Sequence, residues 1–351
     1  MTHAVIMAGG KGTRLWPQSR GNMPKQLWNI LDGISLLQDT VERISPIVSP
    51  EHTWIFTLGA IYERICAQLP QLPQKNIIVE PVGRSTAPCV GLAALYIDDP
   101  DACMVILPSD HIIRRREEFL RSLRAALAMA SEGEHLVTFG IQPTNPETGF
   151  GYIQRGQQIR EDVYAVQQFT EKPDSETAKR FVASDEYYWN SGMFIWKVST
   201  LMTMIERYLP DLHQGLQTIK AAIGTTDEQK VIAEVFEGLA SVSIDYGIME
   251  KAEATFVVPV DFGWNDVGSW AALPDVWETD HAGNSNKGNV ITLDSQGNIV
   301  YNDTGLTALI GVNNMVVVKV GDTVLVCDKE QAQRVREVVD ELNRRGMQEY
   351  L

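Results

Sequence analysis

Three glycine residues stand within four positions near the start of this 351-residue chain, at Gly9, Gly10 and Gly12. They follow an apolar run at residues 4–7 that is typical of a β-strand. Glycine has no Cβ, so its backbone adopts positive φ angles and approaches a ligand closely. Successive backbone N–H groups in such a loop point into one concavity, which suits a row of phosphates. The stretch therefore predicts a phosphate-binding loop at the end of a first strand.

Two common phosphate-binding motifs are excluded by the residues that follow. The Walker motif requires Gly-Lys followed by Ser or Thr, whereas Lys11 is followed by Gly12. The dinucleotide fingerprint requires a third glycine three residues after Gly12, where this chain has Leu15. Arg14 and Lys25 add mobile positive charge near the loop. The loop is thus a different kind of phosphate site.

Acidic residues follow two later apolar runs. Asp110 comes shortly after residues 103–107, and Asp266 comes shortly after residues 256–260. Mg²⁺ prefers oxygen ligands and usually takes one or two carboxylates together with substrate phosphate oxygens. Asp110 is therefore a candidate magnesium ligand, with capping of the next helix as the plainer alternative. Asp266 is a second candidate, and for it a purely structural role is the plainer interpretation of the residue taken alone.

A third candidate is the adjacent pair Glu171 and Lys172, which precedes Pro173. A carboxylate can accept charge-assisted hydrogen bonds from two neighbouring sugar hydroxyls. The ammonium group beside it can neutralise a phosphate on the same sugar. A solvated strand end is the plainer interpretation of such a pair taken alone.

The elements that must position these residues alternate between strand and helix. Alternation of this kind indicates parallel βαβ units, and open α/β sheets bind ligands beyond the carboxyl ends of their strands. We therefore expect an α/β fold with a mixed, mostly parallel sheet whose rim carries the glycine loop and Asp110. The expected strands are residues 4–7, 53–57, 76–80, 103–107, 136–141 and 256–260, with helices after Ser35, at 62–69 and after 114–116, and residues 190–196 as a loop entering a strand.

The character of the sequence changes around Asn284. Short β-type runs alternate with Gly, Asn and Asp turns, which is compatible with a few coils of a β-solenoid, and an amphipathic helix follows at residues 330–344. We expect two domains, a catalytic domain at residues 1–283 and a small β-rich domain at residues 284–351.

Charge and cysteine content restrict the partners and the compartment. The net charge of −15 argues against nucleic acid and anionic membranes, because both would be repelled. The four cysteines show neither metal-ligand spacing nor a disulfide pattern, and no signal segment or membrane-spanning run is apparent. We expect a cytoplasmic protein whose anionic substrates are bound by local cations.

The longer motif, residues 9–17 followed by Pro24 and Lys25, reads Gly-Gly-x-Gly-Thr-Arg-Leu-x-Pro…Pro-Lys. It resembles the signature of the sugar-phosphate nucleotidyltransferases, which join a nucleoside triphosphate to a sugar 1-phosphate and release pyrophosphate. The resemblance implies a Rossmann-like fold of the nucleotide-diphospho-sugar transferases. It implies a nucleotide site at Ala8, Gly9, Gly10, Gly12, Thr13, Arg14, Lys25, Pro81, Arg84, Thr86, Ala87, Ser109 and Asp110.

Further segments resemble the guanylyl branch of that family. Residues 80–88 match its Glu-Pro-x-x-Arg-Asn-Thr-Ala-Pro loop, except that Ser85 replaces the usual Asn, and residues 190–194 read Asn-Ser-Gly-Met-Phe. The segments Glu-Thr-Gly-x-Gly-Tyr-Ile and Phe-x-Glu-Lys-Pro are also present. The resemblance implies a sugar-phosphate site at Gly149, Gly151, Tyr152, Glu171, Lys172, Asn190 and Asp261, with Asp261 alternatively ordering its loop.

The same resemblance implies chemistry and partners. Mg²⁺ on Asp110 and Asp266 would assist in-line attack of the sugar phosphate on the α-phosphate, with Arg14, Lys25 and Lys172 as the catalytic cations. The implied substrates are GTP and mannose 1-phosphate, the products are GDP-mannose and diphosphate, and a β-helical tail implies a homodimer. Two alternatives stay open: the same chemistry with another nucleotide or hexose, and a non-catalytic sugar-nucleotide-binding regulator.

Overall fold

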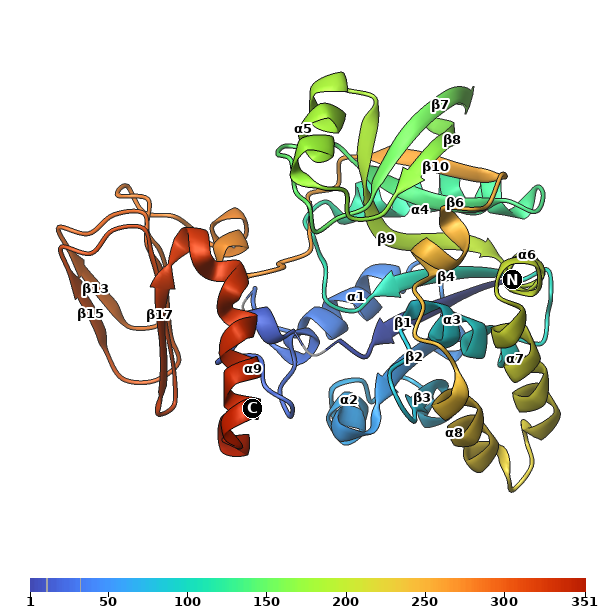
Figure 1. The fold of residues 1–351 in the computed structure, drawn as a ribbon, viewed down its shortest axis with the longest axis horizontal. Helices are drawn as coiled ribbons and strands as arrows, with labels where there is room; N and C mark the ends of the chain where they lie inside the picture. Colours follow the sequence, from blue (N-terminus) through green and yellow to red (C-terminus); the bar gives the residue numbers. More distant parts are fainter. Residues whose placement is uncertain (11, 32) are drawn as a thin grey trace. The chain divides into compact units, whose positions relative to one another are not determined.

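The computed structural model describes residues 1–10, 12–31 and 33–351, so that Lys11 of the glycine loop and Asp32 lie outside the described residues (Figure 1). The chain divides into two compact units, each of which is described by itself. Unit 1 comprises Met1–Gly9, Val41–Ser109 and Ile113–Trp264, and unit 2 comprises Gly10–Thr40, Asp110–Ile112 and Asn265–Leu351.

Unit 1 is built on one large mixed sheet. Its strands lie in the order β3 (Ile77–Glu80), β2 (Thr53–Leu58), β1 (Thr2–Ala8), β4 (Cys103–Pro108), β9 (Tyr187–Lys197), β6 (Leu136–Ile141), β10 (Thr255–Val260), β8 (Val163–Thr170) and β7 (Tyr152–Arg160). The pairs along β3-β2-β1-β4 and the pair β6–β10 are parallel, whereas β9, β8 and β7 pair antiparallel with their neighbours. The expected mixed α/β sheet is confirmed, and it is mostly parallel only in its N-terminal half.

The antiparallel share is larger than expected because the β7–β8 hairpin carries no signal in the sequence. These two strands are rich in glutamine and are only partly buried, so they lack the apolar alternation by which a strand is recognised. The loop predicted at Asn190 is also wrong. This residue lies inside β9, which already begins at Tyr187, and the polar and glycine residues 190–192 that indicate a loop belong to an irregularity within the strand.

Helices cover the sheet of unit 1. Their bounds are α1 (Leu36–Ile44, which continues from unit 2), α2 (Tyr62–Gln68), α3 (Thr86–Leu95), α4 (Arg116–Ser131), α5 (Ser175–Ser184), α6 (Val198–Tyr208), α7 (Pro210–Ala222) and α8 (Glu228–Gly238). Helix α3 is apolar on all sides, and it packs between β1 and β2 and helices α6 and α7. A Cβ on Gly91 of α3 would lie 2.7 Å from a methyl of Leu216, so glycine lets α7 approach closely.

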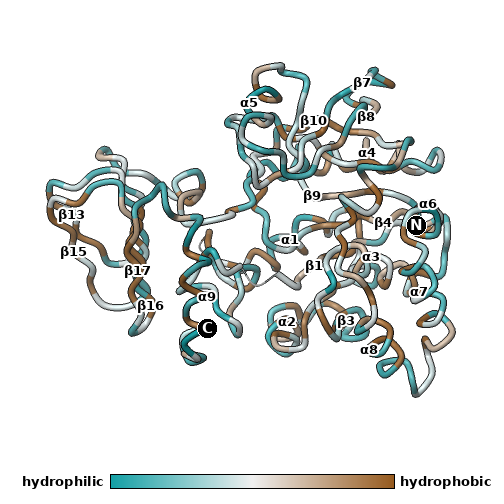
Figure 2. The backbone as a smooth tube through the Cα atoms, in the orientation of Figure 1, coloured by the Kyte–Doolittle hydropathy of each residue, from teal (hydrophilic) through white to brown (hydrophobic). Residues whose placement is uncertain are grey.

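Unit 2 contains the expected solenoid. Strands β12 (Ser285–Lys287), β14 (Ile299–Asn302) and β16 (Met315–Val320) stack in parallel, as do β13 (Val290–Leu293) and β15 (Thr307–Ile310), and β17 (Thr323–Asp328) closes the stack antiparallel to β16. Hydrophobic residues follow β16 and β17 in Figure 2. Buried Asn298 joins successive coils, since its amide donates to Asn284 Oδ1 at 3.0 Å and to the Val312 carbonyl at 2.7 Å. The last helix, α9 (Val335–Arg345), and the short strands β5 (Ile112–Ile113) and β11 (Trp264–Asn265) complete the elements described.

An aromatic core joins the N-terminal segment Gly10–Thr40 to the C-terminal module within unit 2. Trp28 packs against Trp270 and Tyr301, with ring centroids 5.6 and 5.3 Å apart. The Trp270 indole donates to the Trp16 carbonyl at 3.0 Å, and the Trp16 indole donates to the Tyr350 carbonyl at 2.8 Å. Packing therefore places the segment after the glycine loop with the module at the end of the chain, while the domain boundary at 283/284 stays a prediction.

Two further expectations concern the whole chain. Cys66, Cys89, Cys103 and Cys327 are all free thiols. Among the described residues, no helix combines the length and the apolar composition that crossing a membrane requires.

Candidate active site

The glycine loop leaves β1 and enters a tight turn at Thr13–Leu15. Gly12 has a φ of 60°, in the left-handed region that favours glycine. A Cβ at this position would lie 2.7 Å from Lys25 Cβ and 2.8 Å from Ser19 Oγ. Glycine at position 12 is thus required for the loop to pack directly against the Lys25 side chain.

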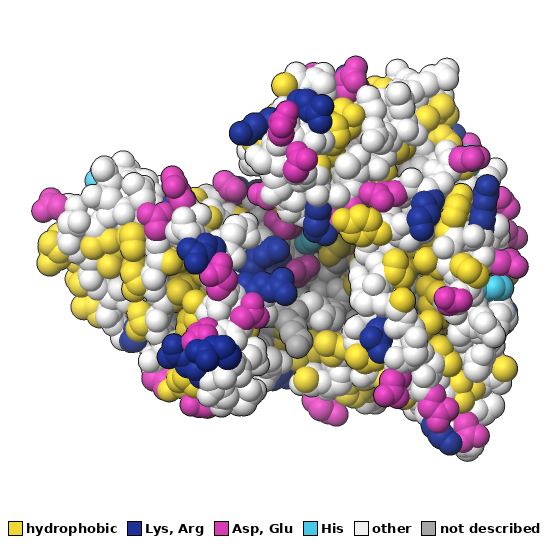
Figure 3. Space-filling model, in the orientation of Figure 1, with side chains coloured by type: hydrophobic (Ala, Val, Ile, Leu, Met, Phe, Trp, Pro, Cys, Tyr) yellow, Lys and Arg dark blue, Asp and Glu magenta, His cyan; other side chains and the backbone are white. Residues whose placement is uncertain are grey.

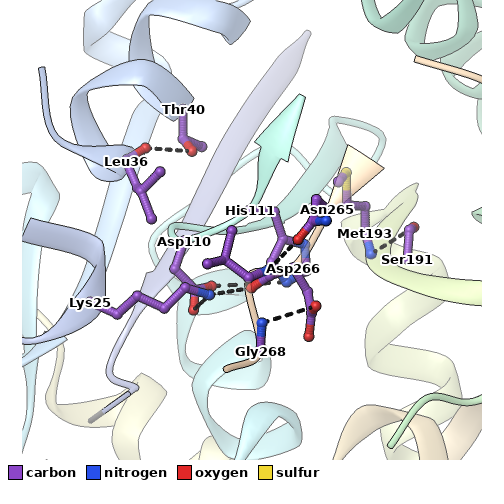
Figure 4. A network of polar contacts seen from close by, with 11 residues as sticks. Lys25, Leu36, Thr40, Asp110, His111, Ser191, Met193, Asn265, Asp266 and Gly268 are labelled. Carbon is purple, nitrogen blue, oxygen red and sulfur yellow. Dashed lines mark hydrogen bonds and ion pairs between the residues drawn. The ribbon is translucent and has the colours of Figure 1, made fainter. Parts of the chain in front are cut away.

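Lys25 lies between the two aspartates that the sequence singles out (Figure 4). Its ammonium group donates to Asp110 Oδ2 at 2.8 Å and also to the backbone carbonyl of Asp266. Lys25 is only 5% exposed, whereas the Asp110 side chain is 32% exposed. The sequence predicts Lys25 on the triphosphate. In this structure its ammonium group contacts the Asp110 carboxylate and the Asp266 backbone, and Lys25 and Asp110 both line the pocket described below.

The backbone around Asp266 is held in an uncommon conformation. Val267 has a φ of 43°, which is rare for a β-branched residue. Asn265 Oδ1 accepts from the Val267 N–H at 2.7 Å, and Asp266 Oδ1 accepts from the Gly268 N–H at 3.2 Å. These bonds hold the turn that directs the Asp266 carbonyl at Lys25, and such strain is common at functional sites.

The surroundings of the two carboxyl groups move their pKa values in opposite directions. Burial opposes ionisation of Asp110, but Lys25 and His111 outweigh burial and lower its pKa below the ordinary value. Burial also dominates at Asp266, and the nearby Asp110 charge adds to it against the opposing effect of Lys25, so that the Asp266 pKa is raised. Two carboxyls whose pKa values are driven apart are typical of a functional site.

A pocket of about 240 Å³ lies beside this pair, and every described residue that lines it belongs to unit 2. The structure gathers six predicted residues there: Gly12, Thr13, Arg14, Lys25, Asp110 and Asp266. Arg336 of α9 and His111 also line the pocket. Within the described residues, no group of three or more His, Cys, Asp or Glu side chains forms a metal site. The two carboxylates nevertheless have the chemistry to hold Mg²⁺, which usually takes one or two carboxylates in addition to substrate phosphate oxygens.

A second polar cluster lies in unit 1 and includes residues predicted to bind the sugar phosphate. The Lys172 ammonium pairs with Glu171 Oε1 at 2.5 Å, and the Asn190 amide donates to Asp245 Oδ1 at 2.8 Å. A Cβ on Gly151 would lie 2.5 Å from Glu171 Oε2, so the missing side chain makes room for that carboxylate. Gly151, Glu171, Lys172 and Asn190 therefore lie together, with Asp245 added.

A β-bulge directs Asn190. Strand β9 pairs with β6 at Phe194–Thr138 and again at Asn190–Gly140, so β9 uses more residues than β6 between these points. Gly192 within this stretch has a φ of 70°, and its N–H donates to Asn190 Oδ1 at 3.2 Å. Bulges of this kind re-aim a side chain next to a binding site.

Asp245 is a residue whose role the sequence does not reveal. It begins a turn of π-helix at Asp245–Met249, a form often found at functional sites. Burial raises its pKa to about 6, and the charge of Glu171 adds to this effect. The motif Ser-x-Asp-Tyr is recognisable in the sequence, but only the fold brings this carboxylate to Asn190.

Glu80 also escapes sequence reasoning. It is the last residue of β3 and is 6% exposed. A Cβ on Gly9 would lie 3.9 Å from Glu80 Oε1, so the carboxyl lies beside the start of the glycine loop. Burial raises the pKa of Glu80 to about 7, against a hydrogen bond from Cys89 that lowers it. The one sequence signal for Glu80 is its position directly before Pro81 in the predicted nucleoside-binding loop.

Several residues of the predicted nucleotide site have partners within the protein. The Arg84 guanidinium donates to the carbonyls of Phe236 and Glu237 at the end of α8, where a cation stabilises the helix dipole. The Thr86 hydroxyl accepts from the Ile244 N–H at 2.8 Å, and the Ala87 N–H donates to Val242. These residues tie the predicted nucleoside loop to the segment that leads to Asp245.

Two further residues predicted at the sugar have other partners in the structure. Tyr152 is fully buried, and its hydroxyl donates to the Glu147 carbonyl at 2.9 Å. The Asp261 carboxylate pairs with Arg115 in a separate pocket between α4 and β10. Tyr152 therefore supports its loop, and the loop-ordering alternative describes the contacts of Asp261 better.

The remaining predicted residues follow the strands as expected. Ala8 ends β1, Gly9 and Gly10 follow it, Pro81 follows β3, Ser109 follows β4 and donates its N–H to the Met7 carbonyl, and the Gly149 N–H donates to Glu147.

Comparison with known proteins establishes the family. Residues 3–283 match the model of the family described as "Nucleotidyl transferase", and residues 288–342 match "MannoseP isomerase/GMP-like beta-helix domain". The chain belongs to the nucleotidyl transferase family. Enzymes of this family generally use a divalent metal ion.

Relatives resemble the chain over almost its full length. The mannose-1-phosphate guanylyltransferase of Salmonella muenchen is 40% identical, across 99% of this chain and 74% of that protein. The xanthan biosynthesis protein XanB of Xanthomonas campestris pv. campestris is 42% identical, across 98% of this chain and 74% of that protein. A crystal structure from Thermus thermophilus, described as a mannose-1-phosphate geranyltransferase, is 38% identical with a TM-score of 0.88, across 97% of this chain and 99% of that one.

The raised pKa of Asp245 makes a prediction about stability. Because the folded-state pKa of about 6 exceeds the ordinary 3.8, stability is lost as the pH rises from 4 to 6. Asp245→Asn keeps the acceptor for Asn190 and removes the charge. We expect the variant to match the wild type near pH 4 and to exceed its free energy of unfolding by about 3 kcal/mol at pH 7, measured by urea unfolding. The exposed Asp227→Asn serves as control, and a gap that does not change with pH would contradict the assignment.

Proposed function

We propose that this chain is a mannose-1-phosphate guanylyltransferase, which makes GDP-mannose and pyrophosphate from GTP and α-D-mannose 1-phosphate. The observation that carries the proposal is the pocket of unit 2, where glycine-loop donors and Arg14 meet an acidic pair ordered by Lys25. The relatives that carry this name support the choice of substrates.

The proposed reaction is a direct displacement. An oxygen of the sugar phosphate forms a bond to the α-phosphorus of GTP, the bond from that phosphorus to the bridging oxygen breaks, and the electron pair leaves with pyrophosphate. A phosphate dianion is nucleophilic without a general base, so the protein contributes positioning and charge stabilisation. Arg14 binds the triphosphate, and Lys172 binds the sugar phosphate.

Lys25 has a different proposed role from the other two cations. It keeps Asp110 ionised and fixes the turn at Asp266. Asp110 and Asp266 would hold Mg²⁺, whose chemistry is to neutralise phosphate oxygens. Lys25 thus acts on the reaction through the two carboxylates.

Glu80 provides a means of choosing guanine. An ionised carboxylate accepts hydrogen bonds only, and guanine presents two adjacent donors, N1–H and the N2 amino group. Adenine presents an acceptor at N1, and uracil and thymine present one donor between two acceptors. The carboxyl lies beside Gly9 at the edge where the glycine loop begins, and base choice through Glu80 does not need the amide that Ser85 replaces.

The polar cluster of unit 1 suits a hexose. The carboxylates of Glu171 and Asp245 and the amide of Asn190 can each hydrogen-bond to sugar hydroxyls, and Lys172 supplies the charge for the phosphate. Each sugar hydroxyl has one O–H to donate, and the carboxylate oxygens of this set can accept it.

An exposed apolar strip on the β13–β15 sheet supports a homodimer. Leu293 and Ile310 are opposite each other in this sheet and are 54% and 70% exposed, with Ile291 and Leu306 nearby at 47% and 53%. Hydrophobic side chains gather on this module in Figure 3. Contiguous exposed apolar surface marks an interaction site, and a second copy of the chain is the proposed occupant. A cytoplasmic location, in keeping with the free thiols, belongs to the same proposal.

The proposed function predicts one productive pair of substrates. Pyrophosphate release with Mg²⁺ would be measured for mannose 1-phosphate and glucose 1-phosphate against GTP, ATP, UTP and dTTP. We expect turnover with GTP and mannose 1-phosphate, and about 10²–10³-fold less with Asp110→Ala, which also controls for contaminating enzymes. Activity with another pair alone would overturn the substrate assignment, and nucleotide binding without any turnover would favour a regulator.

Glu80 predicts how the base is discriminated. Inosine triphosphate lacks the N2 amino group, so the wild type should prefer GTP to ITP in kcat/KM by about tenfold or more. Glu80→Gln should bring this ratio close to one, while Glu63→Gln on the exposed face of α2 should leave it unchanged. Because the Glu80 pKa is about 7, the KM for GTP should rise as the pH falls below 7. An unchanged GTP/ITP ratio in Glu80→Gln would refute this role.

The apolar strip predicts the oligomeric state. Wild-type protein should have the mass of a dimer in multi-angle light scattering, and Ile310→Lys should shift it to a monomer because a buried charge opposes the contact. Ile159→Lys, at an exposed position of β7, should remain a dimer. A wild type that stays monomeric at high protein concentration would contradict the proposal.

A further inference from the structure

Arg336 lies in the first turn of α9, in the module at the end of the chain, and lines the same pocket as Arg14, Asp110 and Asp266. Arg336 belongs to none of the motifs recognised in the sequence. It lies at the opposite end of the chain from the glycine loop. The tertiary fold of unit 2 alone brings it there.

The contact between α9 and the loop is firmly built. Leu15, at the end of the tight turn after Gly12, shares a buried cluster with Val335 of α9. Trp16 follows and donates its indole N–H to the Tyr350 carbonyl beyond the same helix. The helix that carries Arg336 is therefore fixed directly against the segment that carries Arg14.

The charge of Arg336 has no evident role in stability. A cation in the first turn of a helix is opposed by the helix dipole. Arg334 pairs with Glu337 at 2.8 Å, and Arg344 and Arg345 both pair with Glu341. Arg336, in contrast, forms no ion pair with any residue that the structure describes, and its exposed side chain lines an acidic pocket.

The pocket needs this charge, because Lys25 is already engaged. Two of the Lys25 protons are used on Asp110 and on the Asp266 carbonyl. Of the described arginines and lysines that line the pocket, Arg14 and Arg336 are left to face a ligand. A guanidinium group binds phosphate through parallel hydrogen bonds and keeps its charge at every relevant pH.

We propose that Arg336 binds the β- and γ-phosphates of the nucleoside triphosphate and stabilises the pyrophosphate that departs. The proposal rests on the proposed function and adds the C-terminal helix to the reacting site. When the bond from the α-phosphorus to the bridging oxygen breaks, the electron pair stays on that oxygen. Arg336 then donates hydrogen bonds to pyrophosphate oxygens, and no proton is transferred.

The composition of the two sites indicates that Arg336 binds the phosphates that leave as pyrophosphate and not the sugar phosphate. Glu171, Lys172, Asn190 and Asp245 all belong to unit 1. None of these four lines the pocket that holds Arg336. The sugar phosphate already has a cation in Lys172, whereas the outer phosphates depend on the cations of unit 2.

The test compares Arg336→Ala, Arg336→Lys and the control Arg334→Ala. Dissociation constants would be measured by calorimetry, in Mg²⁺, for GTP, for inorganic pyrophosphate and for GDP-mannose. We expect Arg336→Ala to weaken GTP and pyrophosphate about 10- to 100-fold, as for the loss of one or two charge-assisted hydrogen bonds. GDP-mannose, which lacks the departing group, should be affected less than about twofold. Arg336→Lys should recover part of the loss, and Arg334→Ala should behave as wild type.

Two results would overturn the inference. GTP and pyrophosphate could bind Arg336→Ala as tightly as Arg334→Ala, or GDP-mannose could weaken as much as GTP. A wrong substrate assignment can be distinguished from a wrong role for Arg336, because pyrophosphate leaves in every nucleotidyl transfer from a nucleoside triphosphate. If the wild type turns over another substrate pair, Arg336→Ala should still bind pyrophosphate more weakly than the wild type does.

Discussion

The ammonium group of Lys25 is the interaction on which the candidate site depends. It is nearly excluded from water and bonded to the Asp110 carboxylate and the Asp266 backbone. In a chain with a net charge of −15, two neighbouring carboxylates cannot both stay ionised without a cation beside them. Removing one partner of a buried ion pair typically costs about 3–5 kcal/mol, so the lysine is as much a part of the fold as of the site.

The tryptophan core of unit 2 keeps Lys25 and Asp266 together. The two residues are separated by 241 positions in the chain. Trp28, shortly after Lys25, packs on Trp270, shortly after Asp266. Large aromatic side chains bury much apolar surface and hold one geometry. The predicted phosphate-binding loop is thereby fixed to the module at the end of the chain.

In unit 1, irregular backbone segments bring polar groups together at the end of a sheet, where the groups pair with one another. The bulge in β9 turns Asn190, the π-helical turn presents Asp245, and Gly151 leaves space for Glu171. Each of these features is a local departure from regular secondary structure. The regular parts of the sheet hold these departures in position, as is usual for binding sites on α/β folds.

Local sequence was sufficient to predict the fold class, most strands and helices, and much of the chemistry. Apolar runs such as 103–107 are unbroken, and the helix expected after Ser35 begins with a capping box, in which Ser35 Oγ accepts from the Gln38 N–H at 3.2 Å. The glycine loop and both aspartates are recognisable because their residue types and spacing carry the chemistry. The polar hairpin β7–β8 is not, because strands rich in glutamine lack an apolar signature. The partner that each charged side chain takes, in contrast, depends on the folded chain. Lys25 turns to the aspartates and Arg84 to the end of a helix, although both are cations in recognised motifs, and Arg336 reaches the phosphate pocket without any motif. A charged group on a long side chain responds to the field of residues far away in the sequence, and that field exists only once the chain has folded.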